Sequence, residues 1–348
     1  MKKVYLILLA VILSLPIFGQ DEPTSHIVMF YNVENLFDIY DDPVVRDDEF
    51  TPDGFKEWTE AKYKSKLSNI EEVIYTLSAS NKKFPAIIGL SEIENRRVLD
   101  DLVSTPKLAM ANYQIVHYDS PEARGVDVAL LYRPDLFTYI KSDVFQPEIP
   151  ERPDFKTRDI LAVYGTIEGE LFCFFVNHWS SRIGGAHQSE YLRCGCAQTL
   201  RDYADSIQVA HPDIKIVIMG DMNDDPKDKS MAEVIGAKEK LSQVEAGGYF
   251  NPFWSMQKGG YGTLGYQDSW SLFDNMIVNS NLLPGEMGGG KLRLLKGAKN
   301  KYYGTVFKRP FMVQSKGKYK NYPLRTFSGN TFMDGYSDHF PVYIVIGK

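Results

Sequence analysis

Short apolar runs, each bordered by acidic, amide or histidine side chains, recur along this chain of 348 residues and constrain its fold more than any other feature. Each run has the length of a buried β-strand, and residues 86–90 and 214–219 are the clearest examples. In open α/β sheets, polar groups at strand ends meet at one edge of the sheet. The pattern therefore predicts an α/β fold with one polar site where several strands end.

The polar residues that border these runs fall into six groups. In chain order they are Asn32, Glu92, His178, the pair Asp221 and Asn223, Asp274, and the pair Asp338 and His339. Neighbouring side chains on a regular strand point to opposite faces, so Asp338 and His339 can share a site only on the irregular backbone of a strand entrance. Any single group has a structural alternative, such as an Asx-type turn at Asp221 and Asn223. Their joint occurrence at strand ends favours one shared site.

The ordered set resembles the endonuclease/exonuclease/phosphatase superfamily, which contains metal-dependent phosphodiesterases and phosphatases related to DNase I, exonuclease III, sphingomyelinases and inositol-polyphosphate phosphatases. The resemblance extends over nearly the whole chain after the first 19 residues, in the family's order. It implies an α/β fold of the DNase I type, a four-layer α/β/β/α sandwich in which two mixed sheets pack face to face. It also implies hydrolysis of phosphate esters.

The resemblance assigns a role to most of the groups. Glu92 matches the metal-binding glutamate, Asn32 the N-terminal asparagine, and His178 the mid-chain histidine. Residues 220–223 match the family's GDxN motif, and residues 337–339 match its terminal SDH motif.

The acid that orients the catalytic histidine is the least direct match. Many relatives have an arginine-isoleucine-aspartate sequence at this point, where this chain has Phe273, Asp274 and Asn275. Asp274 is the expected residue because it opens an apolar strand, and Asp268 is the alternative.

Phosphodiester hydrolysis requires the same residue types on chemical grounds. Negative charge develops on the phosphate oxygens, and a divalent cation held by oxygen ligands stabilises it. We therefore expect Mg²⁺, or alternatively Mn²⁺ or Ca²⁺, at Glu92 and Asp338. Zinc is not indicated, because the three cysteines have no CxxC spacing and the six histidines form no HExxH motif.

The remaining groups are expected to move protons and to position reacting atoms. His339 would take a proton from water while Asp274 fixes its tautomer, and His178 would donate to the phosphate or protonate the leaving group. Asp221 and Asn223 would position the water or the leaving oxygen.

Substrate contacts are expected from Asn32 and Arg182. Arg182 follows His178 in a glycine-containing loop, and its planar guanidinium matches phosphate oxygens. A surface salt bridge explains this arginine equally well.

The distribution of charge is the best guide to the substrate. Residues 291–325 contain eleven lysines and arginines and no acid, interleaved with aromatic residues, in a chain of formal net charge −6. Lysines can contact phosphates and aromatic rings can stack on bases, so a nuclease acting on DNA or RNA is the favoured function. The alternative enzyme is a phosphodiesterase or phosphatase for lipid headgroups or inositol phosphates, of the sphingomyelinase type. A hairpin whose lysines protect an exposed sheet edge is the structural explanation.

Residues 1–19 have the features of a signal peptide, because Lys2 and Lys3 precede an apolar stretch and Gly19 precedes Gln20. The stretch is too short to favour a membrane span. We expect an exported bacterial protein, periplasmic or secreted, in which residues 20–348 form a single catalytic domain, since no linker or repeat divides them. No protein partner is indicated, and we expect a monomer.

Apolar periodicity predicts two helices, one from residue 59 to 77 and one from residue 189 to 207. The second helix would bury Cys196 and turn Cys194 away from the core. Three cysteines in an exported chain permit one disulfide and one free thiol, and we expect Cys173 and Cys196 to pack near each other.

Overall fold

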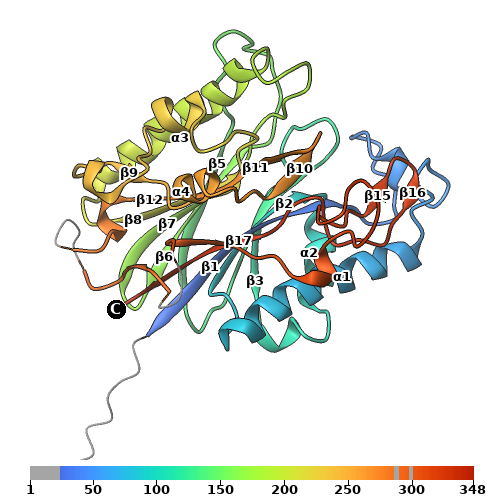
Figure 1. Cartoon of the computed structure of the whole chain (residues 1–348), viewed down its shortest axis with the longest axis horizontal. Helices are drawn as coiled ribbons and strands as arrows, with labels where there is room; N and C mark the ends of the chain where they lie inside the picture. The colour runs from blue at the N-terminus through green and yellow to red at the C-terminus, as the bar shows by residue number, and fades with distance from the viewer. Residues whose placement is uncertain (1–23, 286–289, 298–300) are drawn as a thin grey trace, which may run out of the picture.

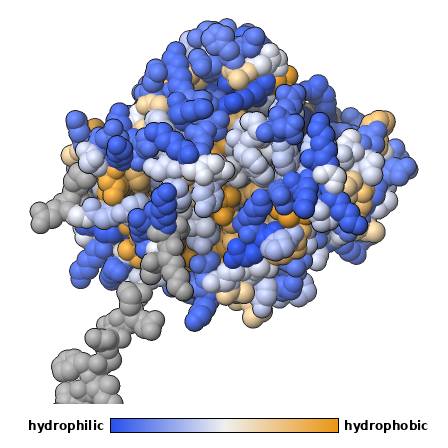
Figure 2. All heavy atoms as spheres, in the orientation of Figure 1, coloured by the Kyte–Doolittle hydropathy of each residue, from blue (hydrophilic) through white to orange (hydrophobic). Residues whose placement is uncertain are grey.

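The computed structural model of the chain describes residues 24–285, 290–297 and 301–348. The signal peptide predicted at residues 1–19 lies outside these residues. Two β-sheets occupy the centre of the molecule, and the long helices lie on its outer sides (Figure 1). The face drawn in Figure 2 is mostly hydrophilic, with smaller apolar areas between the hydrophilic residues.

The first sheet has the strand order β13-β17-β1-β2-β4-β3, and β14 also pairs with β17. It is a mixed sheet, because β1 and β2 are parallel whereas the other neighbours are antiparallel. Its strands are β1 (Ser25–Leu36), β2 (Ile87–Ile93), β3 (Gln114–His117), β4 (Asp127–Tyr132), β13 (Arg293–Leu295), β14 (Gly304–Val306) and β17 (Val342–Gly347).

The second sheet has the strand order β5-β6-β7-β8-β12-β9. It is also mixed, with β7 and β8 parallel and the other pairs antiparallel. Its strands are β5 (Thr138–Phe145), β6 (Ile160–Ile167), β7 (Glu170–His178), β8 (Lys215–Asp221), β9 (Tyr249–Phe250) and β12 (Asp274–Asn279).

Helices and two small hairpins complete the described chain. The helices are α1 (Glu60–Asn81), α2 (Arg96–Val103), α3 (Glu190–Ala210) and α4 (Trp254–Lys258). One hairpin joins β10 (Leu264–Tyr266) to β11 (Ser269–Ser271), and the other joins β15 (Phe327–Ser328) to β16 (Thr331–Phe332). Among the described helices, none combines the length and apolar character that crossing a membrane requires.

Side-chain alternation along the strands builds three apolar cores. On β1, Val28 and Phe30 belong to the core between the sheets, whereas Met29 and Tyr31 belong to the core shared with α1 and α2. On β7, Phe174 enters the core between the sheets and Phe175 enters the core shared with α3. Each sheet is therefore covered on both faces. This confirms the predicted α/β/β/α sandwich of two mixed sheets.

Both predicted helices are confirmed. The side chain of Thr59 caps α1 by accepting from the backbone N–H of Lys62, and Ser189 precedes α3. The three cysteines are free thiols, and Cys173 and Cys196 lie in the same apolar core.

The basic segment at residues 291–325 divides into two parts. Its first part contributes β13 and β14, which both pair with β17, β13 along the second half of that strand and β14 along the first half. Its last part, from residue 314 onward, forms an exposed loop that lines a cavity with β10. A role in covering a sheet edge therefore fits the first part of the basic segment, and the second part is exposed and could contact a ligand.

Candidate active site

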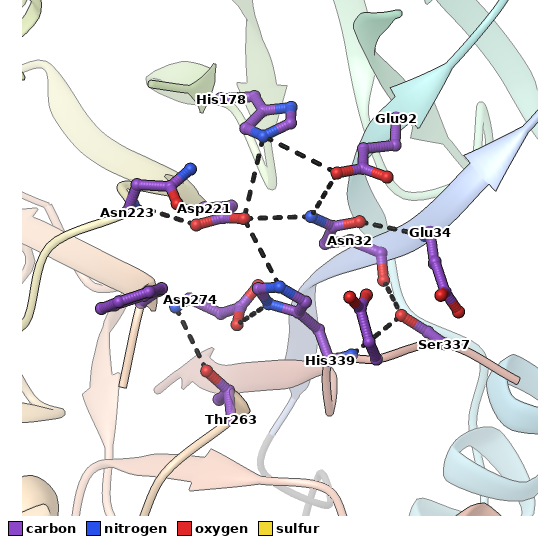
Figure 3. Close-up of polar contacts among 12 residues, drawn as sticks. Asn32, Glu34, Glu92, His178, Asp221, Asn223, Thr263, Asp274, Ser337 and His339 are labelled. Atoms are coloured by element: carbon purple, nitrogen blue, oxygen red, sulfur yellow. Dashed lines mark hydrogen bonds and ion pairs between the residues drawn. The ribbon is translucent and has the colours of Figure 1, made fainter. Parts of the chain in front are cut away.

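The polar residues predicted at strand ends lie on neighbouring strands of both sheets. In the second sheet, Asp221 at the end of β8 is opposite His178 at the end of β7 and opposite Asp274 at the start of β12. In the first sheet, Asn32 of β1 is paired with the residue before Glu92 on β2. Because the two sheets pack face to face, these side chains meet between them (Figure 3).

The backbone at these positions departs from regular strand geometry. The register between β1 and β2 shifts after Asn32, and Glu34 and Glu92 have left-handed φ angles of 55° and 63°. Asn223 has a φ of 50°. This conformation is uncommon for residues other than glycine and costs roughly 1–3 kcal/mol, and such residues cluster at functional sites. It breaks the strand's alternation, so polar side chains close in sequence can face the same site.

The Asp221 carboxylate is the centre of the polar network in Figure 3. Its Oδ2 accepts a hydrogen bond of 3.0 Å from Nδ2 of Asn32, and its Oδ1 accepts one of 2.9 Å from the backbone N–H of Asn223. The same Oδ2 lies 3.8 Å from Nε2 of His178 and 3.7 Å from Nε2 of His339. Two imidazoles therefore face one carboxylate. Burial raises the pKa of Asp221 to about 6, although the charge of His339 opposes this shift.

His339 is held by a second buried carboxylate. Its Nδ1 donates to Oδ2 of Asp274 at 2.7 Å. Burial alone would lower the pKa of His339, but the charges of Asp274 and Asp221 outweigh burial and raise this pKa well above its ordinary value. Asp268, the alternative orienting acid, lies exposed in the turn between β10 and β11. The structure thus places Asp274, and not Asp268, against the histidine.

His178 has a different environment. Its imidazole is buried beside Arg158, whose Nη2 lies 3.4 Å from Nε2 of His178. Burial, together with the charges of Arg158 and Arg124, lowers the pKa of His178 well below its ordinary value. At neutral pH the ring is therefore uncharged. The same Nε2 lies 3.9 Å from Oε1 of Glu92. The neutral ring of His178 is therefore close to one carboxylate of each sheet, Glu92 of the first and Asp221 of the second.

Arg158 is a site residue that the sequence analysis did not identify. It is buried, and its Nε has no hydrogen-bond partner in the described part of the chain. A buried guanidinium that has an N–H group without a partner is suited to binding a phosphate. It reaches the site because β6 (Ile160–Ile167) pairs antiparallel with β7, so the segment just before β6, which contains Arg158, lies beside His178 at the end of β7. No local motif marks it, since only the strand order makes these residues neighbours.

Glu92 is the residue best placed to bind a divalent cation. Its Oε1 accepts from Nδ2 of Asn32 at 3.3 Å, and its Oε2 accepts from the backbone N–H of Asn35 at 2.8 Å. Both donors are neutral amides, and the side chain is 16% exposed. A cation would therefore displace no positively charged partner of Glu92, and carboxylate oxygens are ligands that Mg²⁺ prefers, so Glu92 fits the expected cation. Asp338 differs, because its Oδ2 accepts from Nη2 of Arg325 at 2.9 Å and a cation would compete with this arginine.

Two groups of three side chains, among residues that the structure describes, have ligand atoms close enough to share a cation. The groups are Asp221, Asp274 and His339, and His117, Asp119 and Asp127. In the first group Asp274 and His339 are already bonded to each other, which suits proton transfer better than metal binding. Neither group contains Glu92 or Asp338, the two ligands that the sequence predicted.

An ion network supports the SDH segment. Lys66 of α1 is buried, and its Nζ donates to the carbonyl of Tyr336 at 3.0 Å. The carboxylate of Glu34 accepts from Nε of Arg325 at 3.2 Å, and Arg325 in turn holds Asp338. Burial, with the charge of Asp338, raises the pKa of Glu34 to about 7, and burial lowers that of Lys66 to about 8. The sequence analysis did not identify this network.

Arg182 lies in salt bridges outside the central network. Its Nη2 lies 2.5 Å from Oδ2 of Asp228 and 3.1 Å from Oδ1 of Asp224, and its Nε donates to the carbonyl of Asn223 at 2.8 Å. These contacts fit the salt-bridge explanation of Arg182 better than a substrate contact. Through Asn223, the arginine fixes the backbone that carries the GDxN motif.

The model of the Endonuclease/Exonuclease/phosphatase family matches residues 27–348 of this chain. A comparison with curated proteins finds no matching sequence.

Several solved structures share the fold. TDP2 from D. rerio, complexed with single strand DNA product, is 13% identical, with 93% of this chain and 100% of that chain covered and a TM-score of 0.54. An endonuclease/exonuclease/phosphatase family protein from Bacteroides thetaiotaomicron is 17% identical, with 94% and 98% covered and a TM-score of 0.55. A mannosyl-6-phosphatase from the same species is 17% identical, with 92% and 99% covered and a TM-score of 0.54. With the family match over almost its whole length, the chain belongs to the endonuclease/exonuclease/phosphatase family, whose members are phosphoester hydrolases.

Proposed function

We propose that this chain is an exported, metal-dependent hydrolase that cleaves phosphodiester bonds in nucleic acid. The observation that carries the proposal is the pair of imidazoles facing Asp221, with His339 oriented by Asp274 and His178 beside Arg158. This arrangement offers two groups for proton transfer and one cation for a phosphate around a single carboxylate.

The cation would be held by Glu92, with Asp338 as the second ligand once it leaves Arg325. Mg²⁺ is the expected ion, and Mn²⁺ or Ca²⁺ could take its place. When bound, the ion supplies positive charge to the phosphate oxygens as negative charge develops on them.

The chain's own residues would carry the proton transfers. Asp274 fixes His339 so that Nε2 points toward Asp221, where His339 takes a proton from water. Nearby carboxylates raise the pKa of His339 and so favour its protonated form. Positive charge bound in the site would lower this pKa again, and the neutral imidazole could then take the proton. His178 and Arg158 donate to the phosphate, and Asp221 with Asn223 positions the reacting oxygen.

Nucleic acid is the proposed substrate because the exposed basic loop after residue 314 adjoins Arg325, which holds Asp338 beside His339. A phosphatase or headgroup phosphodiesterase is the second candidate. The observation in its favour is a cavity of about 720 Å³ at the same place, since typical small-molecule sites measure roughly 300–1,000 Å³.

The test is hydrolysis by the purified chain of plasmid DNA, single-stranded DNA, RNA, sphingomyelin, inositol phosphates and sugar phosphates, with Mg²⁺ or with chelator. We expect Mg²⁺-dependent loss of nucleic acid that disappears in Glu92→Ala. Turnover of only a headgroup or sugar phosphate would replace the proposal with the second candidate, and no turnover of any substrate would contradict both.

A further inference from the structure

The cavity of about 720 Å³ lies directly beside the catalytic segment. One wall is the hairpin of β10 and β11, and the other is formed by residues 314–333. Arg325 and Asp338 both line the cavity, and Asp338 precedes His339. A group bound there would therefore be joined to a phosphate at the catalytic residues by only a few bonds.

The hairpin is fixed to the catalytic strand by backbone and ring contacts. Leu264 of β10 forms a β-bridge with His339, and the backbone N–H of Phe340 donates to the carbonyl of Thr263 at 2.9 Å. On β11, Trp270 stacks on Phe340 with 6.0 Å between ring centroids. These contacts fix the position of the cavity wall relative to His339.

Aromatic rings face the cavity from both walls. Tyr266 stands on the hairpin and is 66% exposed, and Tyr319 stands on the opposite loop and is 46% exposed. Between them Tyr322 packs against Trp270, and its hydroxyl is buried without a partner in the described residues. A Cβ on Gly265 would lie 2.6 Å from the Tyr322 ring, so glycine is needed for this close approach. The cavity therefore offers stacking surfaces and one unused hydrogen-bonding group.

Positive charge continues from the cavity along the loop. Lys318 lines the cavity, and Lys316 and Lys320 are exposed beside it in sequence. Asp338 is the one carboxylate of the lining, and it is bonded to Arg325. A ligand that has an aromatic base and several linked phosphates matches these tyrosines and lysines, because lysines contact phosphates and tyrosines stack on bases.

We propose that this cavity binds an unpaired nucleobase of a single strand, adjacent to the phosphate that is cleaved. The base stacks on Tyr266 and Tyr319, and the following phosphates contact Lys318 and its neighbours. This inference rests on the proposed function and narrows its substrate to single-stranded nucleic acid. A base that is paired in a duplex has its Watson–Crick edge occupied by its partner and its two faces covered by stacked neighbours, so it cannot enter a cavity between two walls without leaving the stack.

A free sugar phosphate explains fewer of these features. A monosaccharide carries one phosphate and leaves the row of three lysines without a partner. The lining has amide and hydroxyl side chains that could bind sugar hydroxyls, but its one carboxylate is already hydrogen-bonded to Arg325. Two exposed tyrosines and a basic loop fit a polymer better.

The test measures binding and hydrolysis separately for Tyr266→Ala, Tyr319→Ala and Lys318→Ala. Binding of a fluorescein-labelled single-stranded 12-mer is followed by anisotropy in EDTA, where cleavage does not interfere. Hydrolysis of bis(p-nitrophenyl) phosphate with Mg²⁺ is measured as kcat at saturating substrate, so that stacking of its nitrophenyl rings in the cavity affects KM and the chemical step is read separately. Tyr261→Ala is the matched control, because Tyr261 is 48% exposed and lines a different cavity. Tyr266→Phe keeps the ring and should keep binding.

We expect each tyrosine-to-alanine change to weaken binding of the single strand by roughly ten- to a hundredfold, with kcat for bis(p-nitrophenyl) phosphate unchanged. Wild-type protein should bind the matching duplex more weakly than the single strand. Unchanged binding in the tyrosine variants, preference for the duplex, or displacement by mannose 6-phosphate but not by a mononucleotide would overturn the proposal. If bis(p-nitrophenyl) phosphate is not hydrolysed while single-strand binding still depends on both tyrosines, the proposed hydrolase function fails and the base-binding cavity stands.

Discussion

At the scale of single residues, the pairing of Asp274 with His339 is the contact with the clearest chemical consequence. Asp274 is fully buried, and its Oδ1 has no partner among the described residues, so its charge acts mainly on the imidazole. The raised pKa of His339 depends in part on this charge. Removal of the charge should therefore change both the rate and its pH dependence.

We predict that Asp274→Asn lowers kcat by about two to four orders of magnitude, because the amide neither fixes the tautomer of His339 nor stabilises its protonated form. The pKa of His339 should fall toward its ordinary value, so the pH profile of kcat should shift to lower pH. Asp268→Asn is the matched control, since this acid lies in an exposed turn at a φ of 60°, which asparagine tolerates. Equal losses of activity in the two variants would contradict the assigned role of Asp274.

The site could be predicted from sequence where a side chain directly borders its own strand. Asp221 and His178 each end an apolar run, and the structure brings these ends together as expected. Arg158 and Lys66 were missed because Arg158 precedes β6 and Lys66 lies on α1, and no local pattern reveals that their partners are His178 and Tyr336. For Arg182 the sequence leaves a substrate contact and a salt bridge equally open, and only the fold shows that its partners are Asn223, Asp224 and Asp228, which lie far along the chain.

At the scale of elements, the turn between β6 and β7 ties the two sheets together. Glu168 lies in this turn of the second sheet, at a φ of 50°. Its carboxylate is 2.8 Å from Nε2 of His26 on β1 and is also paired with Lys348 after β17. His26 belongs to the first sheet, and Lys348 directly follows its strand β17. Burial would raise the pKa of Glu168, but hydrogen bonds from Lys348 and His26 outweigh it and lower this pKa to about 2.

We predict that Glu168→Gln lowers the free energy of unfolding by about 1–2 kcal/mol at neutral pH, as expected for a hydrogen bond to a charged group. The folded-state pKa is depressed, so the contribution is complete above the ordinary value of 4.5 and is lost as the pH falls toward 2. Denaturant unfolding of both proteins between pH 7 and pH 3 should show their difference shrinking below pH 4.5. Exposed Glu151→Gln should leave stability unchanged at every pH, and a constant difference for Glu168→Gln would refute the pH argument.

Elements with strong periodicity were predictable, and short ones were not. The 3.6-residue pattern and a capping Thr59 defined α1, whereas the eight residues of α2 are too few to show a pattern. The hairpin of β10 and β11 turns at Gln267 and Asp268, without the asparagine-glycine or glycine signal that marks such turns. The basic segment was one feature in sequence but became two in space, because β17 pairs with its first part only.

At the scale of the whole molecule, the carboxylates gathered between the sheets bring several acidic groups close together in the folded state. Glu34, Glu92, Asp221, Asp274 and Asp338 converge on one site in a chain whose formal net charge is already −6. Burial of these acids is unfavourable to their charged forms, as the raised pKa values of Glu34 and Asp221 show. A bound divalent cation would reduce the unfavourable energy of burying these charged carboxylates, and it would do so in the folded state only.

We therefore predict that Mg²⁺ raises the melting temperature of the wild-type chain. A ligand that binds only the folded state at a hundred times its Kd adds about 2.7 kcal/mol of stability. Glu92→Gln should lose this rise, and without Mg²⁺ it should be at least as stable as the wild type, because one of the mutually repelling charges is gone. Thermal unfolding at matched ionic strength, with KCl replacing MgCl₂, separates specific binding from charge screening. An equal rise of the melting temperature in KCl, or an undiminished rise in Glu92→Gln, would show that Glu92 does not hold the cation. If only Asp338→Asn removes the rise, the cation would instead be bound at Asp338, beside Arg325.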